Sequence, residues 1–190
     1  DHGLRVGLIQ ELRLVLHETH KPAIYVTHDR EEAFALADRL LILHDGMILQ
    51  EGSSEELFVR PASAWIANFL GLGNLIVGEI VSLEPLLVQT ALGVLEAGSG
   101  QDDFQAGQPC RLLLRPQDAL VVDGQPSMPN LIQMGLRDCI FMGEYYRLDL
   151  AAAGMDLQAH SKVAFAPGEV LKVAFLPEKV LCLAERDGKA

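Results

Sequence analysis

A histidine and an aspartate, His28 and Asp29, follow an apolar run in the segment "AIYVTHDREEAF" (residues 23–34). Imidazole titrates near neutral pH, so it can donate a hydrogen bond to an anion or polarise a water molecule. In open parallel sheets, ligands bind beyond the carboxyl ends of the strands, and His28 stands at that end of the run. The pattern indicates a contact between His28 and a phosphate beside a helix start. The alternative is a structural, hydrogen-bonded histidine.

The elements around this pair have clear local signals. Apolar residues at successive positions of "AIYVT" (23–27) predict a parallel strand that is covered on both faces. Apolar residues at steps of three to four between positions 4 and 17 predict an amphipathic helix before the strand. Asp29 is the expected N-cap of the helix that follows. The Asp45-Gly46 pair between two apolar runs predicts a type I′ hairpin.

The chain changes character near residue 72. Two short helices are expected in "SSEELFVRP" (53–61) and "SAWIANFLG" (63–71). Short β-rich segments separated by Gly and Pro then follow to the C-terminus, a pattern typical of a small antiparallel barrel or sandwich. The expected domains are therefore residues 1–72 and 73–190.

The net negative charge of both halves argues against nucleic acid as a partner. Residues 1–72 carry 6 Lys and Arg against 11 Asp and Glu, and residues 73–190 carry 9 against 15. Nucleic-acid binders usually carry a basic patch instead. Cation binding to Asp102, Asp103 or Asp123 is a weaker alternative to solvated loop carboxylates, and no metal ligand is assigned. The three cysteines, Cys110, Cys139 and Cys182, lie among apolar neighbours, which indicates buried thiols rather than a disulfide or a metal site.

No run of about 18 apolar residues predicts a membrane span. The first residues are not expected to be a signal peptide, because no apolar stretch follows a basic region. The chain opens on Asp1 in the middle of a pattern, without an initiator methionine, so we expect a longer parent protein. It also contains no G-x-x-x-x-G-K-[ST] loop, so a phosphate at His28 would need a cradle from elsewhere in that parent.

Residues 1–71 resemble the C-terminal end of the ATPase domain of bacterial ABC importers, most clearly from residue 25 onwards. The resemblance rests on the ordered series of strand, His-Asp, helix, Asp-Gly hairpin, "EGSSEEL" and P-x-x-x-x-I-A-x-F-L-G. The most similar branch carries an additional C-terminal domain and includes maltose, polyamine, sulfate and iron(III) importers. The implied fold is the incomplete α/β end of a P-loop ATPase domain, followed by an all-β domain of the oligonucleotide-binding (OB) type, called TOBE.

The second half resembles that TOBE domain more distantly. The matching segments are "LLLRPQDALVV" (112–122), "CIFMGEYYRLDL" (139–150) and "VAFLPEKVLCL" (173–183). Gln117 replaces the Glu that is more common in the family after Arg-Pro. We therefore give Arg115 no ligand role and expect it to pair with a carboxylate such as Asp118.

The resemblance implies roles for two residues. His28 matches the family's switch histidine, which contacts the γ-phosphate of ATP, and Asp1 matches the last residue of the D-loop. ATP and Mg²⁺ are the implied cofactors of the intact protein. The implied partners are a second ATPase subunit and the integral-membrane permease subunits, at the cytoplasmic face of the membrane. We expect the 190-residue chain to be inactive by itself and to self-associate through residues 1–71.

Two questions stay open at this level. The solute is expected to be iron(III) or a polyamine, on similarity alone. The alternative function is a TOBE module that senses a ligand or partner, namely an oxyanion, a metal or a regulatory protein.

Overall fold

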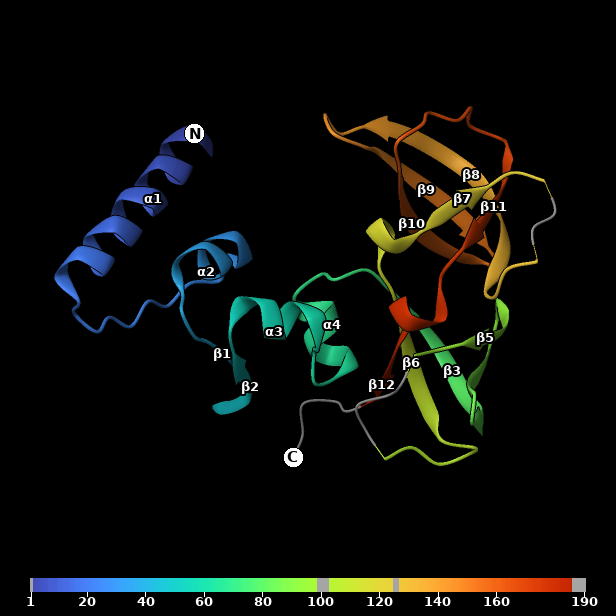
Figure 1. Cartoon of the computed structure of the whole chain (residues 1–190), viewed down its shortest axis with the longest axis horizontal. Helices are drawn as coiled ribbons and strands as arrows, with labels where there is room; N and C mark the ends of the chain where they lie inside the picture. Colours follow the sequence, from blue (N-terminus) through green and yellow to red (C-terminus); the bar gives the residue numbers. More distant parts are fainter. Residues whose placement is uncertain (1, 99–102, 125–126, 186–190) are drawn as a thin grey trace. The chain divides into compact units, whose positions relative to one another are not determined.

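The computed structural model of the chain describes residues 2–98, 103–124 and 127–185 (Figure 1). The chain forms two compact units, Asp1–Ala62 and Ser63–Ala190. The β-rich unit therefore begins at Ser63, ahead of the expected domain start at residue 73, because the helix at Ala64–Phe69 packs against a strand of that unit. The assignment of domains 1–72 and 73–190 to the parent protein stays a prediction.

Within residues 2–62, unit 1 contains three helices and one hairpin. Its elements are α1 (His2–Thr19), α2 (Arg30–Leu36), β1 (Leu40–His44), β2 (Met47–Gly52) and α3 (Ser54–Val59). The hairpin prediction is confirmed, because both turn residues have positive φ, 47° at Asp45 and 78° at Gly46, as a type I′ turn requires. Helix α3 begins with a capping box in which Ser53 and Glu56 satisfy each other's backbone N–H groups.

The prediction of a strand at residues 23–27 is wrong for this chain. The segment has no regular secondary structure and carries no ladder hydrogen bonds, and Ile24 and Val26 are 97% and 90% exposed. A strand exists only where a neighbour pairs with its backbone, and no described strand pairs with this one. The two described strands of unit 1 pair only with each other, and they do so antiparallel.

The described residues of unit 2 form one α-helix and two five-stranded antiparallel sheets. Its elements are α4 (Ala64–Phe69), β3 (Asn74–Leu83), β4 (Leu86–Thr90), β5 (Gly93–Glu96), β6 (Pro109–Leu114), the 3₁₀ turn η1 (Pro116–Asp118), β7 (Leu120–Val122), β8 (Leu131–Phe141), β9 (Tyr146–Ala152), β10 (Met155–Ser161), β11 (Val170–Ala174), the 3₁₀ turn η2 (Pro177–Lys179) and β12 (Leu181–Ala184). The expectation of short antiparallel strands after residue 73 is confirmed.

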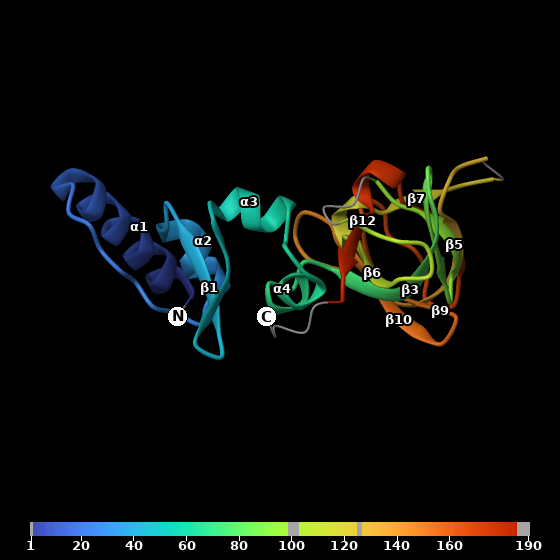
Figure 2. The ribbon, with the colours of Figure 1, turned by 90° about the horizontal axis from the view of Figure 1, so that it is seen from below.

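One hydrophobic core fills unit 2, and Figure 2 shows the strands curving around it. Inward side chains from both sheets are fully buried, in the period-two alternation expected of strands with one covered face. The largest are Ile76, Ile80, Val88, Leu112, Met134, Leu148 and Leu150. No helix in the described part of the chain is both long and apolar enough to cross a membrane.

Unit 2 is built from two structurally equivalent repeats, residues 74–122 and 130–184. The strand orders of the two sheets, β5-β4-β3-β6-β12 and β10-β9-β8-β11-β7, match position by position. The long first strand of each repeat has a β-bulge at the same place, between Ile80 and Ser82 in β3 and between Leu136 and Asp138 in β8. Each repeat therefore has the same fold.

The repeats exchange their last strands. Strand β7 ends the first repeat but pairs with β11 of the second, and β12 ends the second repeat but pairs with β6 of the first. Each exchanged strand follows a 3₁₀ turn that begins with a proline, Pro116 or Pro177. The two repeats consequently share one core and cannot separate without breaking both sheets.

Candidate functional site

His28 lies at the end of the segment 23–27 and is exposed. One side of that segment is tied to helix α2. The hydroxyls of Tyr25 and Thr27 both donate to Glu32 Oε2, at 3.0 Å and 2.6 Å. Ile24 and Val26, which alternate with Tyr25 and Thr27, are almost fully exposed. The segment exposes the apolar side chains of Ile24 and Val26 to solvent, and the imidazole of His28 follows directly after it.

Asp29 fixes the backbone directly after His28. Its carboxylate accepts hydrogen bonds from the backbone N–H groups of Glu31 (2.9 Å) and Glu32 (3.1 Å), as an N-cap does. Its own N–H donates to Thr27 Oγ1 at 3.0 Å. The prediction of Asp29 as a helix cap is confirmed. His28 thus stands between two anchored residues, so its backbone is positioned although its side chain is exposed.

The other predicted site residue, Asp1, lies outside the described residues. The site therefore consists of His28 and the residues that position it, Thr27, Asp29 and Glu32. Such a site can donate a hydrogen bond to a phosphate oxygen or orient a water molecule.

Unit 2 contains a polar cleft of about 1010 Å³. Its charged lining residues are Arg111, Arg137, Asp138, Asp149, Asp156 and Glu185. Most of these charges are paired with each other. Arg111 contacts Glu185 at 2.7 Å, and Arg137 contacts Asp156 at 2.5 Å.

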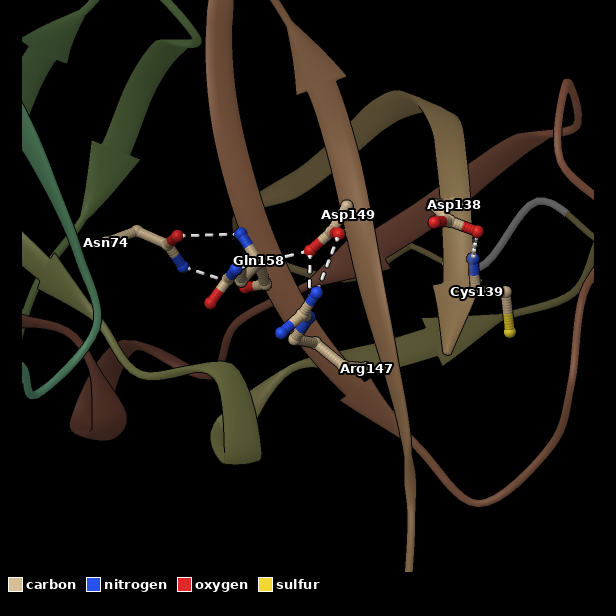
Figure 3. Close-up of polar contacts among 6 residues, drawn as sticks. All are labelled: Asn74, Asp138, Cys139, Arg147, Asp149 and Gln158. Carbon is tan, nitrogen blue, oxygen red and sulfur yellow. Dashed lines mark hydrogen bonds and ion pairs between the residues drawn. The ribbon is translucent and has the colours of Figure 1, made fainter. Parts of the chain in front are cut away.

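A row of polar side chains crosses the strands at this cleft (Figure 3). Asp138 and Asp149 are directly opposite each other on β8 and β9, which is unfavourable for two carboxylates. Arg147 offsets the repulsion, because its guanidinium contacts both Asp149 oxygens at 3.2 Å. Gln158 Nε2 also donates to Asp149, at 3.2 Å. This row could not be predicted from the sequence, because its members come from three strands whose register no local pattern reveals.

Asn74 closes one end of the row. Its Nδ2 donates to Gln158 O (2.8 Å) and Leu114 O (3.0 Å), and its Oδ1 accepts from Gln158 N (2.7 Å). The side-chain amide thereby replaces a neighbouring strand at the β10 edge. Asn130 does the same in the other repeat, with the backbone of Glu96 and with Phe175 O.

The structure also tests the predictions for the three cysteines and for Arg115. Cys110 and Cys182 are buried, as expected, and a hydrogen bond from Cys182 lowers the pKa of Cys110. Cys139 is only half-buried. Burial lowers the pKa of Arg115, and the nearby Asp118 carboxylate opposes this shift, which favours the structural interpretation of that arginine.

Metal ligands are not gathered in the part of the chain that the structure describes. No three His, Cys, Asp or Glu side chains there lie close enough to hold an ion. Asp103 and Asp123 are in this part, whereas Asp102 lies outside the described residues.

The chain is similar to known proteins over its whole length. The chain is 27% identical over 190 residues to the spermidine/putrescine import ATP-binding protein PotA of Acetivibrio thermocellus, and it covers 52% of that protein. It is 28% identical over 160 residues to the Fe(3+) ions import ATP-binding protein FbpC of Photobacterium profundum, with 78% of this chain and 40% of that protein covered.

The chain resembles the C-terminal half of ABC importer ATP-binding subunits. It spans about half the length of the curated relatives it matches. No family model matches it. Among solved structures, the molybdate-binding protein ModG aligns with a TM-score of 0.48 at 13% identity, over 58% of this chain and 95% of ModG.

Proposed function

We propose that this chain is the C-terminal part of the ATP-hydrolysing subunit of a bacterial ABC importer. One observation carries the proposal: similarity to import ATP-binding proteins extends over all 190 residues of the chain. The exposed apolar segment that ends at His28 supports it, because such a segment gains a physical explanation as a strand of a larger sheet. In the parent protein, ATP binding and hydrolysis would drive solute uptake.

The proposed role of His28 is to contact the γ-phosphate of ATP. Phosphoryl transfer depends mainly on positioning and on stabilising charge, and bound Mg²⁺ would neutralise the developing charge on the phosphates. His28 would donate a hydrogen bond to a γ-phosphate oxygen and help to orient the attacking water. The anchoring of Thr27 and Asp29 supports this role, because it fixes the backbone on both sides of the imidazole. Asp1 would act across the interface between two ATPase subunits.

The proposed architecture has two parts. Residues 1–72 would complete an α/β ATPase domain, and residues 73–190 would form the OB-like TOBE domain. The partners would be a second ATPase subunit and the membrane permease subunits, at the inner face of the membrane. The solute would be a polyamine or iron(III), the classes that the names of the relatives give.

A ligand-sensing or partner-sensing role of unit 2 is the second candidate function. The polar cleft favours it, since concave sites with convergent polar groups are where ligands usually bind. The internal pairing of Arg111 with Glu185 and of Arg137 with Asp156 satisfies most of its charges. The cleft therefore does not single out an oxyanion or a metal ion, and the transport proposal stands first.

The proposal predicts that the 190-residue chain binds no nucleotide by itself. His28 can supply one contact to a phosphate, but the sequence has no phosphate-binding loop to surround the other oxygens. Calorimetric titration with Mg²⁺-ATP should release no binding heat, while the full-length subunit should bind at micromolar concentrations. Micromolar binding by the chain alone would contradict the proposed division of the site.

We also predict that the chain self-associates through the exposed segment. Ile24 and Val26 lie on a backbone without ladder hydrogen bonds, which is a template for strand pairing. Light scattering at high concentration should show species larger than a monomer. The double substitution Ile24→Lys and Val26→Lys should reduce their mass, whereas Val163→Lys in unit 2 should not. A monomeric wild-type chain at all concentrations would show that the prediction is wrong.

A further inference from the structure

The outer face of the first repeat exposes an unusual amount of apolar surface. Three side chains there are about half exposed: Val77 (55%) and Val81 (48%) on β3, and Val94 (52%) on β5. We call this surface the β3–β5 face. Single exposed apolar residues are ordinary, but several on one face of one sheet mark an interaction surface.

The second repeat provides an internal control for this face. The residues at the equivalent positions are Gln133, Arg137 and Asp156, as the shared bulge and the matching strand registers show. All three are polar or charged, on the same backbone geometry. The fold therefore does not require apolar side chains at these positions, so the apolar set in the first repeat needs another explanation.

One end of the same sheet face is already covered. Leu113 on β6 alternates with the core residues Leu112 and Leu114, so it points to the outer side, yet it is fully buried. Helix α4 packs against β6. A short helix thus covers part of this face within the chain, which shows the kind of element that the rest of the face can accommodate.

The charges on the β3–β5 face favour a basic partner. Glu79 lies on β3 between Val77 and Val81, and Glu96 lies on β5. Glu84 is exposed at the turn after β3. The nearest cation along the sheet is Arg111, opposite Val77, and it is engaged by Glu185 at 2.7 Å. A second copy packed on this face about a two-fold axis would bring like charges together, which disfavours a homodimer here.

We propose that the β3–β5 face docks an amphipathic helix of another protein, with an apolar stripe flanked by Lys or Arg. The apolar stripe would cover Val77, Val81 and Val94, and the basic flanks would face Glu79, Glu84 and Glu96. The inference depends only on unit 2, so it stands or falls independently of the ATPase function proposed above.

The test uses the full 190-residue chain and a labelled synthetic helical peptide with a leucine stripe flanked by lysines. A matched peptide carries glutamate in place of lysine. Fluorescence anisotropy should show binding of the lysine peptide and markedly weaker binding of the glutamate peptide. Equal affinity for the two peptides, or no binding of either, would overturn the proposal.

The variants place residues of the second repeat at the equivalent positions of the first repeat. The double substitution Val81→Arg and Val94→Asp introduces the residues found at the equivalent positions, and it should weaken lysine-peptide binding about tenfold or more by removing two apolar contacts. Val163→Arg, at an exposed apolar residue of the second repeat, is the matched control and should bind normally. Equal losses in both variants would contradict a specific face.

Charge reversal gives a readout that does not depend on the double variant folding. Glu79→Lys should shift the preference from the lysine peptide towards the glutamate peptide, while the unfolding temperature stays near the wild-type value. Light scattering on the same samples tests the remaining alternative, in which the β3–β5 face is a contact between two copies of the chain. If the chain dimerises and the Val81→Arg, Val94→Asp variant is monomeric, the face is a contact between copies and the proposal is wrong.

Discussion

Replacing His28 by alanine in the full-length subunit should lower the rate of ATP hydrolysis about 100-fold or more while leaving ATP binding intact. Groups that move or orient protons at a reacting centre typically contribute at least this much. Binding should persist because most phosphate contacts in a P-loop ATPase come from backbone N–H groups and a lysine of the phosphate loop. Steady-state hydrolysis and equilibrium binding of a labelled nucleotide would measure the two effects separately.

A matched control is available within the same unit. His44 ends strand β1 beside the hairpin turn, and its ring lies 3.7 Å from the exposed Asp45 carboxylate. Exposed pairs of this kind contribute little, so His44→Ala should hydrolyse ATP at the wild-type rate. Turnover that is unchanged in His28→Ala would remove His28 from the mechanism. Loss of ATP binding in His28→Ala would assign it a binding role instead.

The second large effect is expected at the two asparagines that hold the repeats together. Each side-chain amide of Asn74 and Asn130 makes three hydrogen bonds to backbone groups, including both the N–H and the C=O of one residue on an edge strand. Substitution by alanine leaves these groups without partners, at a cost of about 1–3 kcal/mol for each asparagine. Urea unfolding of unit 2 followed by circular dichroism should show both losses.

Equivalent positions should behave alike. Asn74→Ala and Asn130→Ala should destabilise by similar amounts, because their partners, Gln158 and Glu96, occupy matching places in the two repeats. Gln133→Ala, at an exposed position on β8, is the control and should change stability little. An effect at only one asparagine would contradict the equivalence of the repeats. Stability unchanged in both would show that water replaces the amide at no cost.

Local features of the fold could be predicted well. The hairpin at Asp45-Gly46 follows from the need for positive φ at both turn residues, which Asp and Gly tolerate. The helix starts at Asp29 and Ser53 follow from side-chain oxygens that accept unpaired N–H groups. The strands after residue 73 follow from apolar alternation between Gly and Pro. Each of these depends on residues within a few positions of each other.

The repeat and the strand exchange were not predicted. In the sequence they are visible only as Asn-Leu-Ile at residues 74–76 and 130–132 and as the two Pro turns at 116 and 177. Strand pairing between β6 and β12 joins residues about seventy positions apart, and no local pattern specifies that register. The polar row at Asp138, Asp149 and Gln158 was missed for the same reason.

The segment 23–27 shows which features the sequence determines by itself and which depend on the tertiary structure. Its sequence determines an apolar run that ends before His28 and is followed by a capped helix, and the capped helix is present. Whether the run is a strand depends on a neighbour, because a backbone without a partner forms no ladder. By itself the sequence thus determined the local elements and the position of the histidine. Only the tertiary structure decided which strands pair, which apolar faces stay uncovered and which charges meet, because these depend on contacts between residues far apart in the chain.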